Sequence, residues 1–143
     1  MPWSRDPARI IDEMIETVEE VQREAVFSLF SDVIISTPVD SGRLRGNWFL
    51  SGKTPSSKVS SVRSEGQALG DLAAIFAMNT DTFTLTNNLP YAAKAEFGGF
   101  GYDPESGKTT ASGYSTQAPY GMVRTNVVRW SQIVNDEARK RGR

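Results

Sequence analysis

The stretch TPVDSGRLRGNWFLSG contains four residues with distinctive chemistry within nine positions, namely Asp40, Arg43, Arg45 and Trp48. Carboxylates and guanidinium groups this close together occur in catalytic sites, in contacts with nucleic acid and in ion pairs that hold a fold together. Catalysis has the least support of the three. Ser41 lies beside Asp40, but a nucleophilic serine requires a base to accept its proton, and the chain contains no histidine.

Other routes to an enzyme or a cofactor site are equally weak. Asp103 and Glu105 form a carboxylate pair in a loop that gives no reason for a raised pKa. The segment GGFG lacks the Lys-Ser/Thr pair of a phosphate-binding loop, and the other acids are spread along a helix face. We therefore predict no catalytic, cofactor-binding or metal-binding residue. A hydrolase that uses Ser41 or the acidic loop is the third hypothesis, and its activity would disappear on Ser41→Ala.

Charge is distributed unevenly along the chain. Residues 1–40 carry nine acids and three bases, whereas residues 41–143 carry eight acids and thirteen bases. Two patches of opposite sign can attract each other within a subunit, or between subunits packed head to tail. They are equally compatible with solvated helix faces. The basic second half also motivates the alternative function, a nucleic-acid-binding module, although the sequence pI of about 5.5 lacks the basic excess of a dedicated binder.

The 143 residues are expected to form a single domain, 1–143, because they suffice for one core and show no linker or internal repeat. No apolar run approaches the roughly 20 residues needed to span a bilayer, which predicts no membrane partner. The start, MPWSRDPARI, also lacks the pattern of a secretory signal.

One long helix is predicted over residues 7–36, with Asp6 as its N-cap and Pro7 in its first turn. Apolar residues in its first half lie on one side, whereas its second half is apolar nearly all round. The sheet can cover one face of such a helix, and another subunit could cover the rest. Pro38 is expected to stop it.

The remaining elements predict an α+β fold, in which a small antiparallel sheet is packed by the long N-terminal helix and a C-terminal helix. Period-two alternation predicts strands over 43–50 and 82–88, with Leu44 and Trp48 inward and Arg43 and Arg45 outward. Short helices are expected at 67–78 and around PYAAKAEFG, and the last helix at 119–140. The serine-rich segment 51–66 predicts a flexible arm, and 99–115 predicts a protruding loop or hairpin.

Three motifs occur in order along this framework. They are TPVDSGRLRGNW, TNNLPYAAKAEFGG and QAPYGMVRTNV. This succession resembles the minor tail component, or tail-completion, family of long-tailed bacteriophages, whose members act at head–tail joining and the neck. Matching segments run from Val39 to Arg45, from Asn87 to Gly98 and from Ala118 to Arg124. The sequence departs from the family pattern at Ser41, at Phe97 and in the insertion 99–115.

The resemblance implies a structural virion protein that forms a ring, of six copies, at the head-proximal end of the tail or in the neck. Such a ring would complete the tail and help join it to the capsid connector. Its partners would be further copies of itself and neighbouring tail-terminator, tail-tube or head-closure proteins. DNA would pass through the channel without being read. The protein would reside in the virion, and in the host cytoplasm during assembly.

The motif residues are the candidates for this architecture and assembly. They are Asp40, Gly42, Arg43, Arg45, Trp48, Asn87, Asn88, Pro90, Tyr91, Glu96, Gly98, Pro119, Gly121 and Arg124. The two asparagines suit a strand end, and Pro119 and Gly121 turn the chain into the last helix. We expect Glu96 to accept from Arg43, Arg45 or Arg124. At least one of Arg43 and Arg45 should bond a carboxylate, with Glu96 or an acid of a neighbouring subunit's first helix as its partner.

Overall fold

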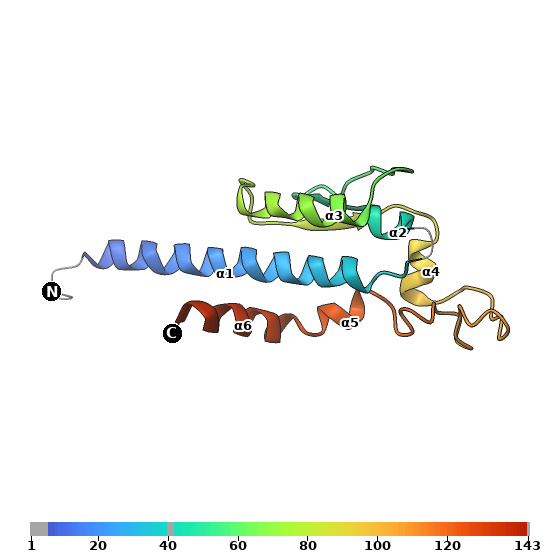
Figure 1. Cartoon of the computed structure of the whole chain (residues 1–143). Helices are drawn as coiled ribbons and strands as arrows, with labels where there is room; N and C mark the ends of the chain where they lie inside the picture. The colour runs from blue at the N-terminus through green and yellow to red at the C-terminus, as the bar shows by residue number, and fades with distance from the viewer. Residues whose placement is uncertain (1–5, 40–41, 143) are drawn as a thin grey trace.

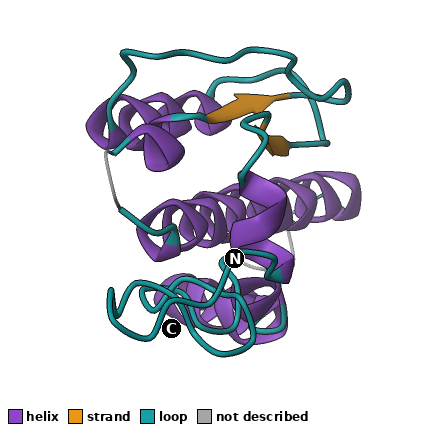
Figure 2. Cartoon of the chain, turned by 90° about the vertical axis from the view of Figure 1, so that its right-hand side faces the viewer, coloured by secondary structure: helices purple, strands orange, loops and turns teal. Residues whose placement is uncertain are grey.

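The computed structural model describes residues 6–39 and 42–142. These residues form three layers, and one long helix is the middle layer. Helix α1 (Pro7–Ser36) runs the length of the molecule (Figure 1). The two-stranded sheet and α3 (Glu65–Asp71) lie on one side of it, and α5 (Arg124–Val127) and α6 (Trp130–Gly142) lie on the other. The end view in Figure 2 shows the same three layers. The predicted α+β class is confirmed.

Helix α1 has the predicted bounds and the predicted start. The carboxylate of Asp6 accepts a hydrogen bond from the backbone N–H of Ala8, and Pro7 occupies the first turn. Thr37 follows the helix with an extended backbone, as expected for a residue before proline. No helix within 6–39 and 42–142 is long and apolar enough to cross a membrane.

The predicted strand 43–50 is wrong in its first half. Residues Arg43–Gly46 form the short helix α2, and strand β1 covers only Trp48–Ser51. Strand β1 pairs antiparallel with β2 (Thr84–Asn87), with Leu50 opposite Leu85. Residues four apart share a face of a helix as well as of a strand. The apolar types of Leu44 and Trp48, which predicted alternation, therefore do not distinguish a strand from a helix, and both side chains are buried.

The predicted helix 67–78 begins two residues earlier and changes type. Ser64 and Gln67 form a reciprocal capping box at the start of α3, and the chain then tightens into the 3₁₀ helix η2 (Leu72–Phe76). The serine-rich segment before it is held to the body rather than free. Asn47 accepts from the backbone N–H of Ser60, and Asn88 donates to the carbonyl of Ser56.

The last helix is shorter than predicted and is interrupted. Residues 119–123 are not helical, and the helix divides into α5 and α6. Val127, the last residue of α5, is half exposed. Helix α4 (Ala92–Phe97) is as predicted, and Gly98 ends it with a φ of +83°, a conformation that favours glycine.

The insertion 99–115 extends from the end of the molecule where α4 lies (Figure 1). Its tip, residues 101–108, is exposed throughout, whereas its base is tied down. The buried Gly113 accepts from the backbone N–H groups of Gly99 and Phe100, and Phe100 packs against the core.

Shortening the tip alone should therefore have little effect on folding. Replacing residues 102–107 by a two-residue Gly-Ser link is expected to change the free energy of unfolding by less than about 1 kcal/mol, since exposed loops tolerate changes in length. Urea denaturation checks this value. A loss of several kcal/mol would mean that the tip stabilises the core, in contradiction to its exposure.

Candidate functional site

The first motif closes the C-terminal end of α1. The Arg45 side chain donates through Nε to the carbonyl oxygen of Thr37 at 2.6 Å and through Nη2 to that of Ile35 at 2.6 Å. Its Nη1 is paired with Glu65 at 3.0 Å. The indole Nε1–H of Trp48 donates to the buried Thr37 hydroxyl at 2.8 Å. The last carbonyls of a helix lack partners within it and carry partial negative charge, so Arg45 supplies both hydrogen bonds and favourable charge.

Arg43 and Arg45, which were predicted to share one face of a strand, have different environments. Arg45 bonds a carboxylate, as predicted, but the partner is Glu65 of α3 and not Glu96. Arg43 is exposed, and its guanidinium forms no ion pair with a residue in the described ranges. Gly42 precedes α2 with a φ of +80°. The predicted turn residues Asp40 and Ser41 lie outside the described residues.

This difference predicts unequal effects of two matched substitutions. Arg45→Ala is expected to lower the free energy of unfolding by roughly 2–3 kcal/mol, because carbonyl groups at the end of α1 lose charge-assisted partners. Arg43→Ala should remain within about 0.5 kcal/mol of the wild type. Thermal and urea denaturation of both variants measure the two values. Equal losses in the two variants would contradict the assignment of Arg45 to the helix end.

The second motif fastens the sheet to α2. Asn87 donates through Nδ2 to the carbonyl of Leu44 at 2.8 Å, and its Oδ1 accepts from the backbone N–H of Leu89. Asn47 is fully buried and donates to the carbonyls of Arg43 and Ser60. Both asparagines therefore satisfy buried backbone groups.

Arg63 has a central position that the sequence did not reveal. Its guanidinium donates to the carbonyls of Gly46 and Trp48, pairs with Asp71, and lies 4.2 Å from the ring centre of Phe49. The only sequence signal was a lone arginine in a serine-rich segment. Glycine at position 46 allows the Arg63 backbone to pack closely against it, because a Cβ there would lie 1.9 Å from the Arg63 carbonyl oxygen.

The second and third motifs meet at Glu96, which is 6% exposed. One carboxylate oxygen accepts from the backbone N–H groups of Met122 and Val123, both at 2.7 Å. The other accepts from the backbone N–H of Arg124 at 2.9 Å and from its Nε at 2.8 Å. The sequence left Arg43, Arg45 and Arg124 as possible partners of Glu96, and the structure shows that the partner is Arg124. We call Glu96, Gly121, Met122, Val123 and Arg124 the Glu96 clamp.

Residues around the clamp fit it closely. The Arg124 guanidinium also donates to the carbonyl of Glu96 and to the Tyr114 hydroxyl, and it lies 4.8 Å from the ring centre of Phe97. Gly121 has a φ of +94°, and a Cβ there would lie 2.7 Å from the Glu96 carbonyl oxygen. Glycine is therefore required at this position on two grounds. Pro119 is exposed and precedes this turn.

The clamp alters the pKa of Glu96. Burial by itself raises the pKa of this carboxyl, but the backbone N–H groups of Val123, Arg124 and Met122 and the Arg124 side chain together outweigh it. The pKa of Glu96 therefore lies below its ordinary value of 4.5. The ionised form is the one that holds α4 against the start of α5.

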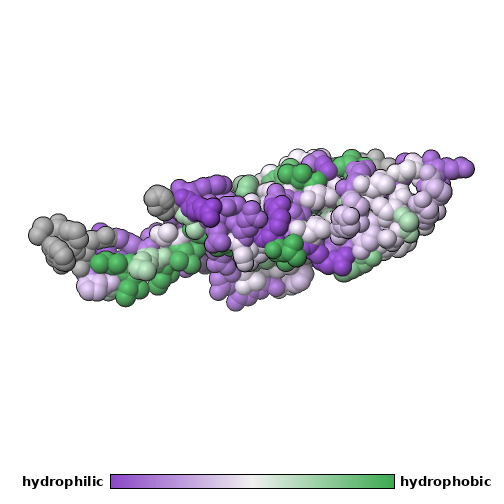
Figure 3. Space-filling view, turned by 90° about the horizontal axis from the view of Figure 1, so that it is seen from below, coloured by the Kyte–Doolittle hydropathy of each residue, from purple (hydrophilic) through white to green (hydrophobic). Residues whose placement is uncertain are grey.

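An apolar stripe on the first half of α1 is left uncovered. Helix α6 ends where Arg141 pairs with Glu20 at 2.6 Å and with Glu24 at 2.5 Å, so the residues of α1 before Glu20 project beyond the body (Figure 1). Figure 3 shows apolar side chains gathered over this projecting end. The four residues of the α1 stripe are each at least 52% exposed, namely Ile11, Met14, Ile15 and Val18.

The stripe continues into an apolar groove between α1 and α6. Val18 and Val21 of α1 face Trp130, Val134 and Ala138 of α6 across a groove of about 550 Å³. Scattered apolar side chains are ordinary on a protein surface, but a contiguous patch marks an interaction site. The stripe and groove together form such a patch.

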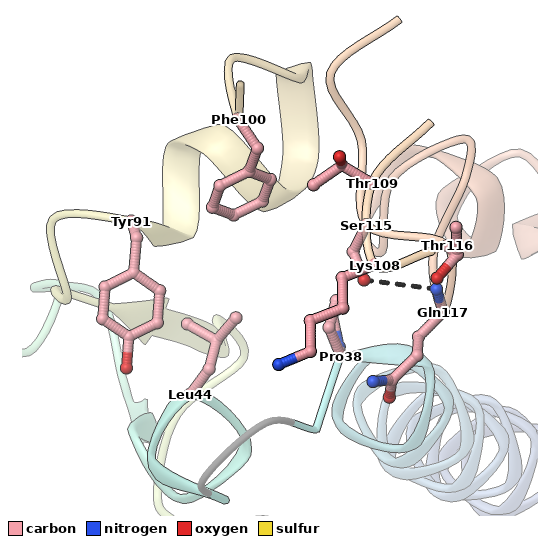
Figure 4. Close-up of a pocket in the computed structure, with 9 residues that line it drawn as sticks. All are labelled: Pro38, Leu44, Tyr91, Phe100, Lys108, Thr109, Ser115, Thr116 and Gln117. Atoms are coloured by element: carbon pink, nitrogen blue, oxygen red, sulfur yellow. Dashed lines mark hydrogen bonds between the residues drawn. The ribbon is translucent and has the colours of Figure 1, made fainter. Parts of the chain in front are cut away.

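A pocket of about 320 Å³ lies at the opposite end of the molecule (Figure 4). Leu44, Tyr91 and Phe100 contribute apolar walls, and Lys108 extends across its mouth. Tyr91, which follows the exposed Pro90 at the start of α4, is the lining residue that comes from the second motif. The lining also includes Pro38 and Gln117, and the latter exchanges hydrogen bonds with the backbone of Val39.

Many bases of the second half are occupied within the chain. Among the described residues, the bases that form internal ion pairs include Arg45, Arg63, Arg124, Arg129, Lys140 and Arg141. These contacts reduce the free basic surface on which the nucleic-acid hypothesis depends. In the part of the chain that the structure describes, no group of three or more Asp or Glu residues is placed to hold a metal ion.

The motif residues thus serve mainly as internal contacts, whereas the stripe, the groove and the distal pocket are surfaces that a partner could cover. The resemblance to the tail-completion family remains a resemblance of motifs and their order. Comparison of the chain with protein-family models, with curated proteins and with solved structures found no match.

Proposed function

We propose that this protein is a structural component of a tailed-bacteriophage virion and assembles as a ring at the head-proximal end of the tail or in the neck. Its activity is binding rather than turnover. The ring, of six copies, completes the tail and contacts neighbouring tail-terminator, tail-tube or head-closure proteins, and DNA passes through it without being read.

The observation that carries the proposal is the exposed α1 stripe. Covering an aliphatic side chain of this size stabilises a complex by about 1.5–3 kcal/mol relative to leaving it in water. Four such side chains on one helix face, continuous with the groove beside α6, favour association over a solitary subunit.

The chemistry of the motifs supports the same proposal. Arg45, Glu96 and Arg124 bind helix ends and backbone groups, so their charges hold elements together. Ion pairs and caps of this kind belong to a scaffold that must keep its shape within an assembly. The three motifs occur in the order that is typical of the tail-completion family. This resemblance supports the virion as the place of assembly.

Sedimentation velocity tests the assembly directly. The purified protein is expected to sediment as a particle near six times the 15.7 kDa mass of one chain. Ile15→Asp should shift it to the monomer, because an ionised carboxylate would have to be buried at the contact. Val62→Asp is the matched control, since Val62 is 88% exposed in a loop away from the stripe. A wild type that stays monomeric at every concentration would overturn the proposal.

A filter-binding assay with duplex DNA separates this function from the nucleic-acid-binding alternative. A structural ring should retain little DNA at physiological salt. A binding module would bind tightly at low salt and lose affinity steeply as salt rises, because each neutralised phosphate releases a counterion. Such a steep loss would favour the alternative.

A further inference from the structure

The α1 stripe is flanked by exposed carboxylates. Asp12, Glu16 and Glu19 are exposed, and none forms an ion pair with another residue in ranges 6–39 and 42–142. Two stripes packed against each other would bring these acids together, and like charges in contact disfavour association. The surface that covers the stripe should therefore be apolar at its centre and basic at its edge.

The distal pocket has an apolar wall, and exposed cations lie near its lining residues along the chain. Leu44, Tyr91 and Phe100 form its apolar wall. Arg43, next to Leu44 in α2, and Lys94, whose stem lies beside Gly99, are both exposed and form no ion pair with a described residue. We call Arg43 and Lys94 the basic rim.

The two surfaces cannot meet within one chain. The stripe lies near the N-terminal end of α1, and the pocket lies beyond its C-terminal end (Figure 1). The 21 positions from Ile15 to Ser36 extend about 30 Å at 1.5 Å per residue. Neither surface can therefore cover the other within the same chain.

We propose that a second copy of this chain covers the stripe, with the acidic stripe of one subunit docked on the pocket and basic rim of the next. The two sides of this contact differ, so two docked subunits leave one stripe and one pocket free for further subunits. Repetition of such a contact gives a ring when the rotation closes, and a filament when it does not. The inference rests on the proposed function and identifies the surfaces that form the ring.

Charge reversal on each side provides the test. The stripe variant carries Asp12→Lys and Glu16→Lys, and the rim variant carries Arg43→Glu and Lys94→Glu. All four side chains are exposed, so both variants should melt like the wild type. Each variant alone now opposes like charges at every contact. Its half-assembly concentration, measured by sedimentation, is expected to rise at least about tenfold.

A mixture of the two variants discriminates between arrangements. In a one-to-one mixture every head-to-tail contact between unlike variants joins opposite charges, so assembly should return to nearly the wild-type concentration dependence. Reversal of Lys53 and Lys58 to glutamate is the control, since these exposed cations lie in the loop after β1 and line neither the pocket nor the groove. The control should assemble as the wild type does.

Three results would overturn the inference. Normal assembly of the rim variant would indicate that stripes pair with each other or with another surface. Normal assembly of the stripe variant would place the contact elsewhere. Failure of the mixture to recover would exclude complementary docking. In each case an assembling wild type leaves the proposed function standing, whereas a monomeric wild type contradicts the proposed function itself.

Discussion

Replacing Glu96 by glutamine is expected to lower the free energy of unfolding by roughly 3–5 kcal/mol at pH 7, because hydrogen bonds to a charged group contribute about 1.5–3 kcal/mol each and are not additive. One half of the glutamine amide is a donor and would face the donors of Arg124. Urea denaturation at pH 7 measures the loss. A variant as stable as the wild type would show that the Glu96 clamp does not stabilise the fold.

The same substitution predicts a change in pH dependence. The folded pKa of Glu96 lies below the ordinary value of 4.5, so its stabilisation is fully present above pH 4.5 and is lost as pH falls through the folded pKa. Glutamine does not ionise. The difference in stability between wild type and Glu96→Gln should therefore shrink as pH falls below 4.5. Glu105→Gln, an exposed control in the loop tip, should show no such difference.

Replacing Trp48 by alanine should cost roughly 3–5 kcal/mol, since a large buried side chain leaves a cavity when truncated. Trp48 is 6% exposed, and its indole N–H is bonded to the buried Thr37 hydroxyl. Trp48→Phe retains most of the packing and loses only the hydrogen bond, so it should cost less than alanine. Soluble yield and urea denaturation compare the two. An alanine variant that melts like the wild type would contradict the anchoring role of Trp48.

Helix α1 could be predicted from the sequence because its signals are local. Asp6 and Pro7 mark the start, and the spacing of apolar residues continues to the end that Pro38 imposes. The exposed first half was also visible as one-sided periodicity. What the sequence could not show is that α6 ends opposite Glu20 and leaves the stripe uncovered.

The α2 segment could not be assigned from its pattern. Leu44 and Trp48 are four positions apart, which satisfies both a strand and a helix. The helix is supported by the bond from Asn87 to the carbonyl of Leu44, 43 positions away, and by the local bond from Asn47 to the carbonyl of Arg43. The bond from Asn87 forms only once β2 has been positioned beside α2 in the folded chain, so the local sequence does not reveal it.

The Glu96 clamp was partly predictable. Glu96 stood out as a carboxylate in an apolar segment, and Arg124 was one of three arginines proposed to reach it. Local sequence could not rank the three, because Glu96 and Arg124 are 28 positions apart. Arg63 was missed for the same reason, since it binds carbonyls of Gly46 and Trp48 across a loop.

Antibody labelling of virions tests the central claim most directly. An antibody raised against the purified protein would be applied to virions from cells that produce it, and the label located by electron microscopy. Label confined to the junction between head and tail is predicted. Virions that lack the protein altogether would contradict the assignment to the neck or the head-proximal tail.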